Sequence, residues 1–174
     1  MKQGTGKTRV ALELTKSTDC DFVLFLCPFS TKENLKNEID KWGLDCSFEI
    51  VGYETLSSSD KTYLRLLDLK KQYQKLFIVA DESVFIKNSD SKRFERMLKL
   101  RDISEYRLIL NGTPITKNEW DIYNQMEFLS PLIIKMSRLE FLQAFLKRYV
   151  TNVKVKILES FTSYQMLILI ISIN

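Results

Sequence analysis

Short apolar runs alternate with amphipathic stretches along most of the chain, and this alternation constrains the fold more than any other feature of the sequence. Four runs are nearly continuous in their apolar character, at residues 21–27, 48–52, 76–80 and 107–110. Such continuity is typical of parallel strands that are covered on both faces. Helices are predicted at residues 8–16, 32–42, 60–73, 91–100 and 118–128. The alternation of the two predicts an α/β domain with a mostly parallel sheet.

The composition limits the chemistry that the chain can perform. Its 174 residues, of which 45% are hydrophobic and 28% charged, suffice for one domain with a buried core. Histidine is absent, which excludes Ser-His-Asp catalysis, Cys-His catalysis and an HExxH zinc site. We interpret the three cysteines as reduced thiols, because Cys20, Cys27 and Cys46 form no CxxC pair. The net charge of +4 is compatible with nucleic-acid binding but does not demonstrate it.

The last forty residues, roughly, depart from the strand–helix alternation. Residues 135–156 carry six basic side chains against one acidic one, and residues 164–173 are almost entirely apolar. We interpret the apolar run either as a strand that needs a partner or as an aggregation-prone end. The chain is therefore divided into a domain at residues 1–150 and an atypical apolar tail at residues 151–174.

No membrane segment is predicted. The polar start of the chain argues against a signal peptide. The longest apolar run, residues 166–171, is far shorter than the roughly 20 residues that cross a bilayer. We expect no association with membranes.

The start of the chain contains the sequence Gly-Thr-Gly-Lys-Thr, which matches the core of a phosphate-binding loop. Gly4 and Gly6, with Thr5 between them, allow backbone N–H groups to close around phosphate oxygens. Lys7 reaches the β- and γ-phosphates, the hydroxyl of Thr8 binds Mg²⁺, and the helix that begins there points its positive end at the anion. The motif therefore predicts a nucleotide phosphate site. The alternative interpretation is an ordinary glycine-containing turn before a helix.

Two further motifs follow predicted strands. Asp81 and Glu82 come directly after residues 76–80. In a P-loop enzyme the first carboxylate holds Mg²⁺ through water and the second orients the attacking water, whereas alone such a pair is typical of a solvated turn. Residues 111–114, Asn-Gly-Thr-Pro, follow the last predicted strand. They are interpreted as a simple turn or as a loop beside the nucleotide, at the sheet edge where α/β proteins bind ligands.

The order and spacing of these motifs resemble the motif series of the Swi/Snf-type helicase-like ATPases of superfamily two. Residues 3–8 are similar to motif I, and residues 81–88, in which Asp-Glu is followed by Ile-Lys-Asn, are similar to motif II. The other matches are residues 27–42 with motif Ia including its terminal tryptophan, residues 50–56 with motif Ib and residues 110–118 with motif III. The resemblance covers about residues 2–150, and the chain looks most like the compact phage and prophage members.

The resemblance implies a three-layer RecA-like P-loop lobe of a DNA-stimulated ATPase that uses ATP and Mg²⁺. It implies that Lys7 and Thr8 bind phosphate and metal, that Asp81 holds the metal and that Glu82 polarises water. Thr113 would couple the state of the nucleotide to double-stranded DNA. The residues assigned to DNA contact are Ser30, Thr31, Lys32, Asn34 and Tyr53. A cytoplasmic location, in a bacterial or phage-infected host cell, is expected from the same resemblance.

The motif Ia assignment also has a physical basis. A helix that starts near Ser30, Thr31 and Lys32 offers hydrogen-bond donors and positive charge to a phosphate. Ser30 and Glu33 have the spacing of a capping box in front of this helix. We therefore predict that the loop before the helix faces the DNA backbone.

Two parts of the family pattern, a strand before the P-loop and a second lobe, are not seen in this sequence. No strand precedes the P-loop, so the sheet is expected to lack its first strand. No second RecA-like lobe follows residue 150, and its arginine completes the ATP site in the family. An arginine finger contributes about three to five orders of magnitude in rate. We therefore expect the isolated chain to bind nucleotide weakly and to hydrolyse ATP negligibly.

Two other functions stay open from the sequence alone. The chain is alternatively a non-catalytic DNA-binding or interaction module that uses the basic residues of 135–156, for which a solvated basic helix is the simpler interpretation. It is otherwise a P-loop ATPase that does not act on nucleic acid. The matches to motifs Ia, Ib and III argue against the latter.

Overall fold

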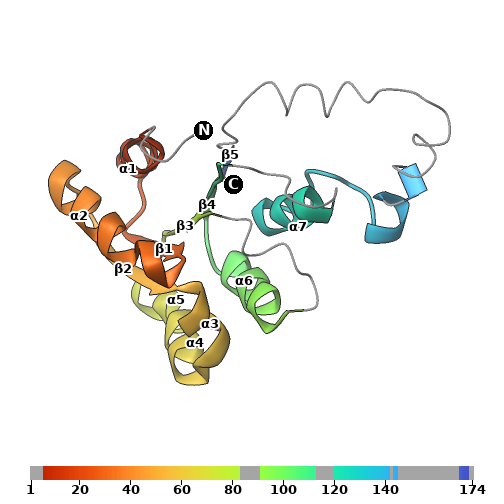
Figure 1. Cartoon of the computed structure of the whole chain (residues 1–174), viewed down its shortest axis with the longest axis horizontal. Coiled ribbons are helices and arrows are strands. Elements are labelled where there is room, and N and C mark those ends of the chain that lie inside the picture. The colour runs from red at the N-terminus through yellow and green to blue at the C-terminus, as the bar shows by residue number, and fades with distance from the viewer. Residues whose placement is uncertain (1–5, 83–90, 113–119, 142, 145–168, 173–174) are drawn as a thin grey trace.

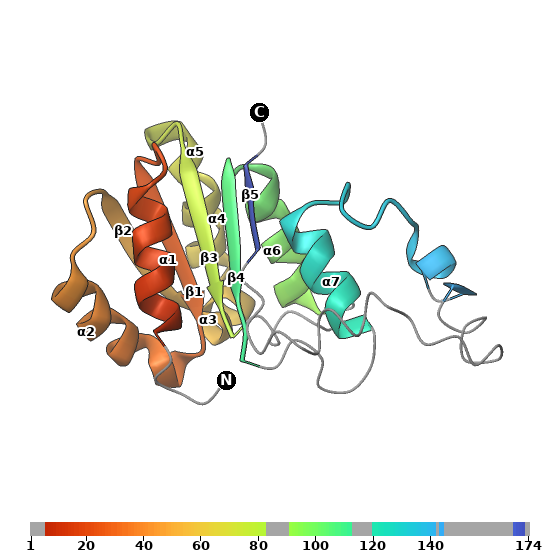
Figure 2. The same ribbon diagram turned by 90° about the horizontal axis from the view of Figure 1, so that it is seen from above.

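A computed structural model of the chain describes residues 6–82, 91–112, 120–141, 143–144 and 169–172. A five-stranded sheet in the order β2-β1-β3-β4-β5 forms its centre (Figure 1, Figure 2). The strands are β1 (Phe22–Cys27), β2 (Ser47–Gly52), β3 (Leu76–Asp81), β4 (Tyr106–Leu110) and β5 (Leu169–Ser172). The first four are parallel and β5 is antiparallel to β4. The four strands predicted from the apolar runs are confirmed, each to within one residue at either end.

Helices cover both faces of the sheet, which gives the three layers that the resemblance implied. α1 and α2 lie on one face, and α3 to α6 lie on the other (Figure 1, Figure 2). The bounds are α1 (Lys7–Lys16), α2 (Lys32–Trp42), α3 (Tyr53–Ser58), α4 (Asp60–Leu67), α5 (Leu69–Gln72), α6 (Lys92–Asp102) and α7 (Trp120–Leu129). Within the described ranges, no helix has the length and apolar character needed to cross a bilayer.

The central strand β1 shows why both faces must be covered. All its residues are buried, and successive side chains point to opposite faces of the sheet. One core contains Phe22, Leu24 and Leu26 together with residues of α3 to α7, and the other contains Val23, Phe25 and Cys27 together with residues of α1 and α2. A strand that is apolar on both faces is stable only between two layers of helices, as in crossover βαβ units.

The helix predicted at residues 60–73 is in fact two helices, so this prediction is wrong in part. The chain turns at Asp68, which separates α4 from α5. The break lets Leu66 and Leu69 both reach the core beneath the sheet. Burial of two apolar side chains outweighs the continuation of one helix, because each buried leucine contributes about 1.5–3 kcal/mol.

The capping box predicted at Ser30 is also wrong. Residues Phe29–Thr31 form a short 3₁₀ turn, η1, and no side chain caps the first turn of α2. The hydroxyl of Thr31 instead donates to the carbonyl of Pro28 over 3.0 Å. The 3₁₀ turn therefore replaces the cap with bonds of its own.

Strand β5 lies in the segment that the sequence marked as an apolar tail. Leu169–Ser172 pairs with β4 from Tyr106 to Ile109. For these residues the strand interpretation of the apolar run is confirmed, and its partner is β4. The domain boundary at residue 150 stays a prediction. In the described ranges no strand precedes α1.

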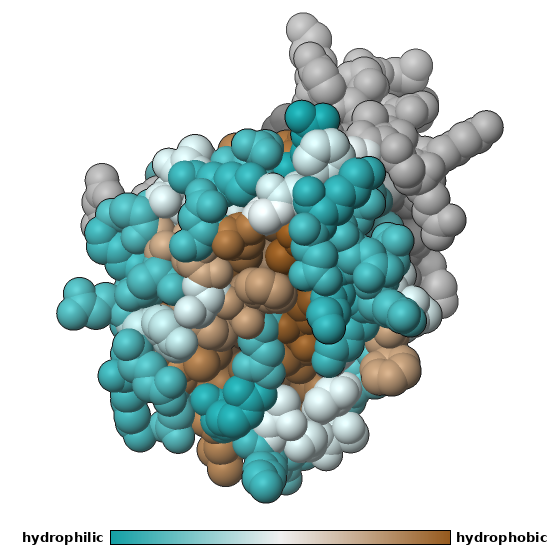
Figure 3. All heavy atoms as spheres, turned by 90° about the vertical axis from the view of Figure 1, so that its left-hand side faces the viewer, coloured by the Kyte–Doolittle hydropathy of each residue, from teal (hydrophilic) through white to brown (hydrophobic). Residues whose placement is uncertain are grey.

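The other edge of the sheet is formed by β2. Figure 3 views the molecule from this side and shows a strip of exposed apolar side chains between bands of polar ones. Phe48 of β2 is 37% exposed. Arg65 of α4 donates to Glu49 of the same strand over 2.7 Å. A charged side chain such as that of Glu49 on an edge strand disfavours pairing with a second chain.

Candidate functional site

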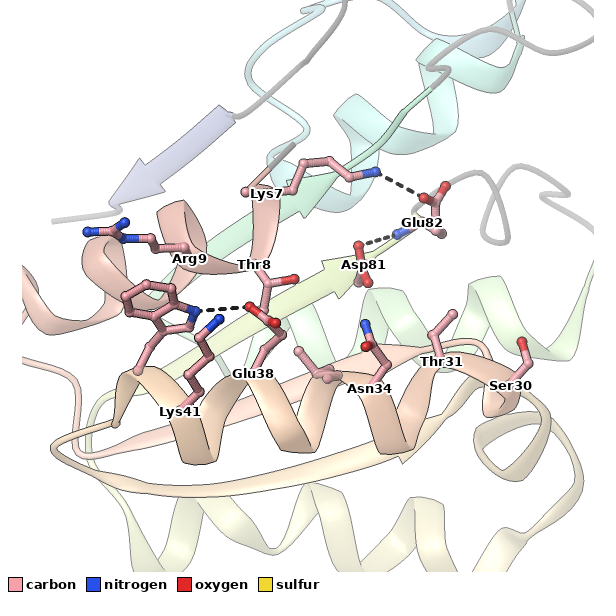
Figure 4. A pocket seen from close by; sticks show the side chains of 13 residues that line it. Lys7, Thr8, Arg9, Ser30, Thr31, Asn34, Glu38, Lys41, Asp81 and Glu82 are labelled. Carbon is pink, nitrogen blue, oxygen red and sulfur yellow. Dashed lines mark hydrogen bonds and ion pairs between the residues drawn. The ribbon is translucent and has the colours of Figure 1, made fainter. Parts of the chain in front are cut away.

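A cavity of about 820 Å³ opens at the carboxyl edge of the sheet (Figure 4). Parallel strands place their carboxyl ends at one edge, where α/β proteins bind their ligands. The end of β3, the start of α1 and one side of α2 bound the cavity. Its lining residues are Gly6, Lys7, Thr8, Arg9, Ser30, Thr31, Asn34, Leu35, Glu38, Lys41, Trp42, Asp81 and Glu82.

The start of α1 provides the donors that a phosphate needs. Gly6 precedes the helix with a φ of 80°, in the left-handed region that glycine adopts without strain. Lys7 and Thr8 are in the first turn, where backbone N–H groups have no partner within the helix. The amine of Lys7 donates to Oε1 of Glu82 over 3.0 Å, and the Lys7 side chain is 14% exposed. The positive charge of Lys7 is therefore held in direct contact with the carboxylate of Glu82.

Asp81 and Glu82 form the opposite wall of the cavity. Asp81 ends β3, and Glu82 follows with a φ of 49°, which is in the left-handed region. The N–H of Glu82 donates to Oδ1 of Asp81 over 3.0 Å. Burial, and secondly the charge of Glu82, raise the pKa of the Asp81 carboxyl, and Lys7 opposes this rise. The carboxylates of Asp81 and Glu82 thus lie close together, and that of Asp81 is poorly solvated.

These residues fit a magnesium ion that is bound jointly with phosphate. Mg²⁺ typically takes one or two protein oxygens and completes its shell with waters and substrate phosphates. Asp81 offers such an oxygen, and the hydroxyl of Thr8 lines the same cavity. A cation beside Asp81 would also offset the cost of its burial. Within the described residues no group of three or more Cys, Asp or Glu side chains forms a closed metal cage.

The raised pKa of Asp81 predicts how the empty chain responds to pH. The folded state holds the proton more tightly than the unfolded state, so this group stabilises the fold below the ordinary pKa of aspartate. That contribution is lost as the pH rises through the raised value. Asp81→Asn is therefore expected to raise the Tm at pH 7 by about 2–4 °C, the change that roughly 1 kcal/mol produces in a domain of this size.

Thermal unfolding at pH 3 and pH 7 tests this expectation. At pH 3 the protonated aspartate resembles asparagine, and the two chains should unfold within about 1 °C of one another. The matched control is Asp45→Asn, since Asp45 is exposed in the loop between α2 and β2. A lower Tm for Asp81→Asn at pH 7 would contradict the argument.

Of the motif Ia residues, Ser30, Thr31 and Asn34 line the same cavity as the P-loop lysine. Figure 4 shows Thr31 and Asn34 rising from the turn before α2 and from its first turn, below Asp81. Ser30, Asn34 and Lys32 are exposed, although Lys32 does not line the cavity. Their assignment to DNA stays a prediction.

Tyr53 does not lie where the sequence placed it. Its side chain is 0% exposed in the core beneath the sheet, so the prediction that it contacts DNA is wrong. The chain turns from β2 into α3 at this residue and directs the ring inward. Gly4, Thr5 and Thr113 lie outside the described residues, so their predicted roles stay predictions.

The far end of the cavity is formed by residues that the sequence motifs did not indicate. The guanidinium of Arg9 lies 4.3 Å from the centre of the Trp42 ring, and the amine of Lys41 lies 4.9 Å from it. The indole N–H of Trp42 donates to Glu38 over 3.0 Å. The i, i+4 spacing of Glu38 and Trp42 on α2 could have indicated this contact. The cluster packs α1 against α2 and closes the cavity at that end.

The cysteines are free thiols, as the sequence predicted. Burial raises the pKa of Cys27 at the end of β1 to about 11. Burial and the neighbouring Cys20 raise the pKa of Cys46 to about 12, and the two sulfur atoms lie 4.0 Å apart. Cys27 and Cys46 are therefore protonated at neutral pH, so neither provides a nucleophile for the site.

Comparison with known families decides the identity of the chain. The model of the SNF2-related domain matches residues 4–169. The chain belongs to the SNF2-related domain family. The match covers the P-loop, the turn before α2 and the two carboxylates, so the cavity is part of this SNF2-related domain.

Curated proteins that resemble this SNF2-related domain are much longer than it. Chromatin remodeling factor mit1 of Schizosaccharomyces pombe is 23% identical over 145 residues, which is 70% of this chain and 10% of mit1. ATP-dependent helicase FUN30 of Saccharomyces cerevisiae is 35% identical over 71 residues, which is 41% of this chain and 6% of FUN30. The chain thus spans a tenth or less of the length of these relatives.

A solved structure supports the fold of the SNF2-related domain. The Sulfolobus solfataricus SWI2/SNF2 ATPase core in complex with dsDNA is similar with a TM-score of 0.58 and 28% sequence identity. The similarity covers 75% of this chain and 30% of that one. The parallel sheet with helices on both faces is therefore a RecA-like lobe of the SNF2 type.

Proposed function

We propose that this SNF2-related chain binds ATP with Mg²⁺ and forms the nucleotide-binding lobe of a DNA-dependent ATPase. The observation that carries the proposal is the convergence of Lys7, Asp81 and Glu82 in one cavity at the start of α1, with Lys7 and Glu82 paired over 3.0 Å. A lysine, a hydroxyl and two carboxylates around a helix N-terminus form the set of groups that phosphoryl transfer requires.

Each residue has a role that follows from its position. The amine of Lys7 would exchange Glu82 for phosphate oxygens, since phosphate carries more charge than one carboxylate. Asp81 and the hydroxyl of Thr8 would hold Mg²⁺, which neutralises charge on the phosphates. Glu82, released from Lys7, would then be free to polarise a water molecule. The Lys7–Glu82 pair would thus be replaced when the nucleotide binds.

Duplex DNA is the partner that we propose for the motif Ia turn. The similar SWI2/SNF2 core of Sulfolobus solfataricus was solved with dsDNA. In this chain Ser30, Lys32 and Asn34 are exposed beside the cavity and offer hydroxyl, amine and amide donors. Such groups contact the phosphate backbone and carry no base specificity.

The proposal is tested by titrating the chain with a fluorescent ATP analogue. We expect binding to be at least about tenfold tighter with Mg²⁺ than with EDTA, because the ion links Asp81 to the phosphates. Hydrolysis by this chain alone is expected to be negligible, since an arginine finger supplied by a second lobe is worth about 10³–10⁵ in rate. Equal affinity with and without Mg²⁺ would contradict the proposal.

Duplex DNA in the same titration separates the alternatives. A DNA-dependent lobe should bind duplex with an affinity that falls steeply as salt rises, and should lose about one unit of the log–log salt slope in Lys32→Gln. Nucleotide binding with no DNA binding at low salt would instead favour a P-loop ATPase that does not act on nucleic acid.

A further inference from the structure

Tyr53 links two strands that are not neighbours in the sheet. It follows β2 directly, yet its hydroxyl donates to the carbonyl of Asp81, at the end of β3, over 2.9 Å. Strand β1 lies between β2 and β3, so the ring passes beneath the end of β1. The ring is 0% exposed and the guanidinium of Arg93 lies 5.7 Å from its centre. A buried hydroxyl in this place has a defined partner rather than solvent.

The bond acts on the peptide unit that joins the two carboxylate residues. That unit consists of the carbonyl of Asp81 and the N–H of Glu82. The Tyr53 hydroxyl holds its carbonyl end, and Oδ1 of Asp81 accepts from its N–H end over 3.0 Å. The orientation of the peptide plane is therefore fixed at both ends.

The backbone conformation of Glu82 is strained, and rotation of this peptide would relieve the strain. Its φ of 49° lies in the left-handed region, which costs a residue with a Cβ atom about 1–2 kcal/mol. Rotation of the preceding peptide would carry φ back to negative values and would take the N–H of Glu82 away from Oδ1 of Asp81. A single neutral hydrogen bond contributes about 0.5–1.5 kcal/mol, which is comparable to this cost. The Tyr53 hydroxyl is thus strong enough to decide between the two orientations.

The same turn contacts the exposed motif Ia loop. Glu54, the next residue of α3, accepts a hydrogen bond from the backbone N–H of Phe29 over 3.0 Å. A Cβ atom added to Gly52 would lie 3.3 Å from Oε2 of Glu54, so the turn is closely packed. The first residues of α3 therefore contact both the carboxylate wall of the cavity and the loop proposed to face DNA.

We propose that Tyr53 is a positioning residue of the metal–nucleotide site, whose hydroxyl fixes the Asp81–Glu82 peptide and through it the carboxylate of Asp81. This inference rests on the function proposed above. Tyr53 touches neither nucleotide nor metal, and acts only through the carbonyl that it holds. Loss of the Tyr53 hydroxyl should reduce the contribution of Mg²⁺ to nucleotide affinity. It should leave the contacts of Lys7 with phosphate unchanged.

The test compares nucleotide affinity with Mg²⁺ and with EDTA in Tyr53→Phe. We expect the Mg²⁺-to-EDTA affinity ratio to fall about fivefold, and the affinity in EDTA to stay within about twofold. The matched control is Tyr106→Phe, which removes a hydroxyl bonded to Asp19 near the start of β4. Its ratio should not change. A Tyr53→Phe chain that keeps the full ratio would overturn the inference.

A double substitution separates positioning from general damage. If Tyr53 acts through Asp81, then Tyr53→Phe should not lower the ratio further in a chain that already carries Asp81→Asn. Additive losses would overturn the inference. If the unsubstituted chain itself shows no Mg²⁺ dependence, the proposed function fails, and the inference fails with it.

A measurement without substitution covers the case in which Tyr53→Phe does not fold. The chain has seven tyrosines, which can all be labelled as 3-fluorotyrosine. One ¹⁹F resonance should shift when Mg²⁺ is added to the nucleotide-bound chain and should be insensitive to a paramagnetic agent in solvent, as a buried ring requires. The absence of a buried resonance that responds to Mg²⁺ would overturn the inference.

Discussion

Replacing Lys7 by alanine is expected to weaken the binding of Mg²⁺–ATP by about 100-fold or more. An amine about 4 Å from a phosphate charge contributes about 4 kcal/mol at an effective dielectric constant of 20. Release of Glu82, which Lys7 holds over 3.0 Å in the empty chain, offsets part of this. The net loss of about 2.7 kcal/mol corresponds to the 100-fold change. Titration with a fluorescent nucleotide measures it directly.

A lysine on the same helix provides the matched control for this prediction. Lys16 is in the last turn of α1, and its amine donates to the carbonyl of Trp42 over 2.9 Å. Lys16→Ala should change nucleotide affinity less than about twofold. Lys7→Ala should unfold within a few degrees of the unsubstituted chain, since a partly exposed ion pair is worth about 1 kcal/mol or less. Unchanged affinity in a folded Lys7→Ala chain would refute the site.

The sheet could be predicted from the sequence because its strands are buried on both faces. Val23 and Leu24 point to opposite faces of the sheet and both are apolar, so the run was visible without knowledge of the neighbours. The convergence of Lys7 with Asp81 followed from one further rule, that parallel strands end at the same edge. These features depend on residue type and order alone.

The role of Tyr53 could not be predicted in that way. Its residue type is equally suited to stacking on a ligand and to packing in a core, and the direction of its ring depends on how α3 follows β2. The capping box failed for a similar reason, because the turn after Pro28 is stabilised by its own 3₁₀ bonds and by Glu54 from another element. A contact over a long sequence separation contributed to both cases, and local 3₁₀ bonds contributed to the second.

The burial of Arg96 could not be predicted from the sequence either. It is in the basic stretch predicted as a helix, yet it is only 5% exposed. Its guanidinium donates to the carbonyls of Leu56 and Ser59 over 2.7 and 3.2 Å and also pairs with Asp60. The ring of Tyr63 lies 4.7 Å from it. Arg96 thus provides donors to carbonyl groups at the end of α3, of which that of Ser59 also accepts from the backbone N–H of Tyr63 over 3.1 Å.

We therefore expect Arg96→Ala to destabilise the fold by about 3 kcal/mol, which would lower the Tm by about 6–12 °C. Removal of the guanidinium takes its donor away from the buried carbonyl oxygen of Leu56 and opens a space beside Tyr63. Urea denaturation, which reports the free energy of unfolding, and thermal unfolding both measure the loss.

Lys92 distinguishes the carbonyl bonds from the ion pair. Its amine also pairs with Asp60, over 2.8 Å, but its side chain is 56% exposed. Lys92→Ala should cost about 0.5 kcal/mol or less, because an exposed pair is solvated and screened by salt. Equal losses in the two variants would show that attraction to Asp60 is what stabilises this region. Arg96 and Lys92 pair with the same carboxylate, but only Arg96 is buried and donates to the carbonyl of Leu56. A larger loss of unfolding free energy in Arg96→Ala than in Lys92→Ala would therefore be due to the buried carbonyl bond.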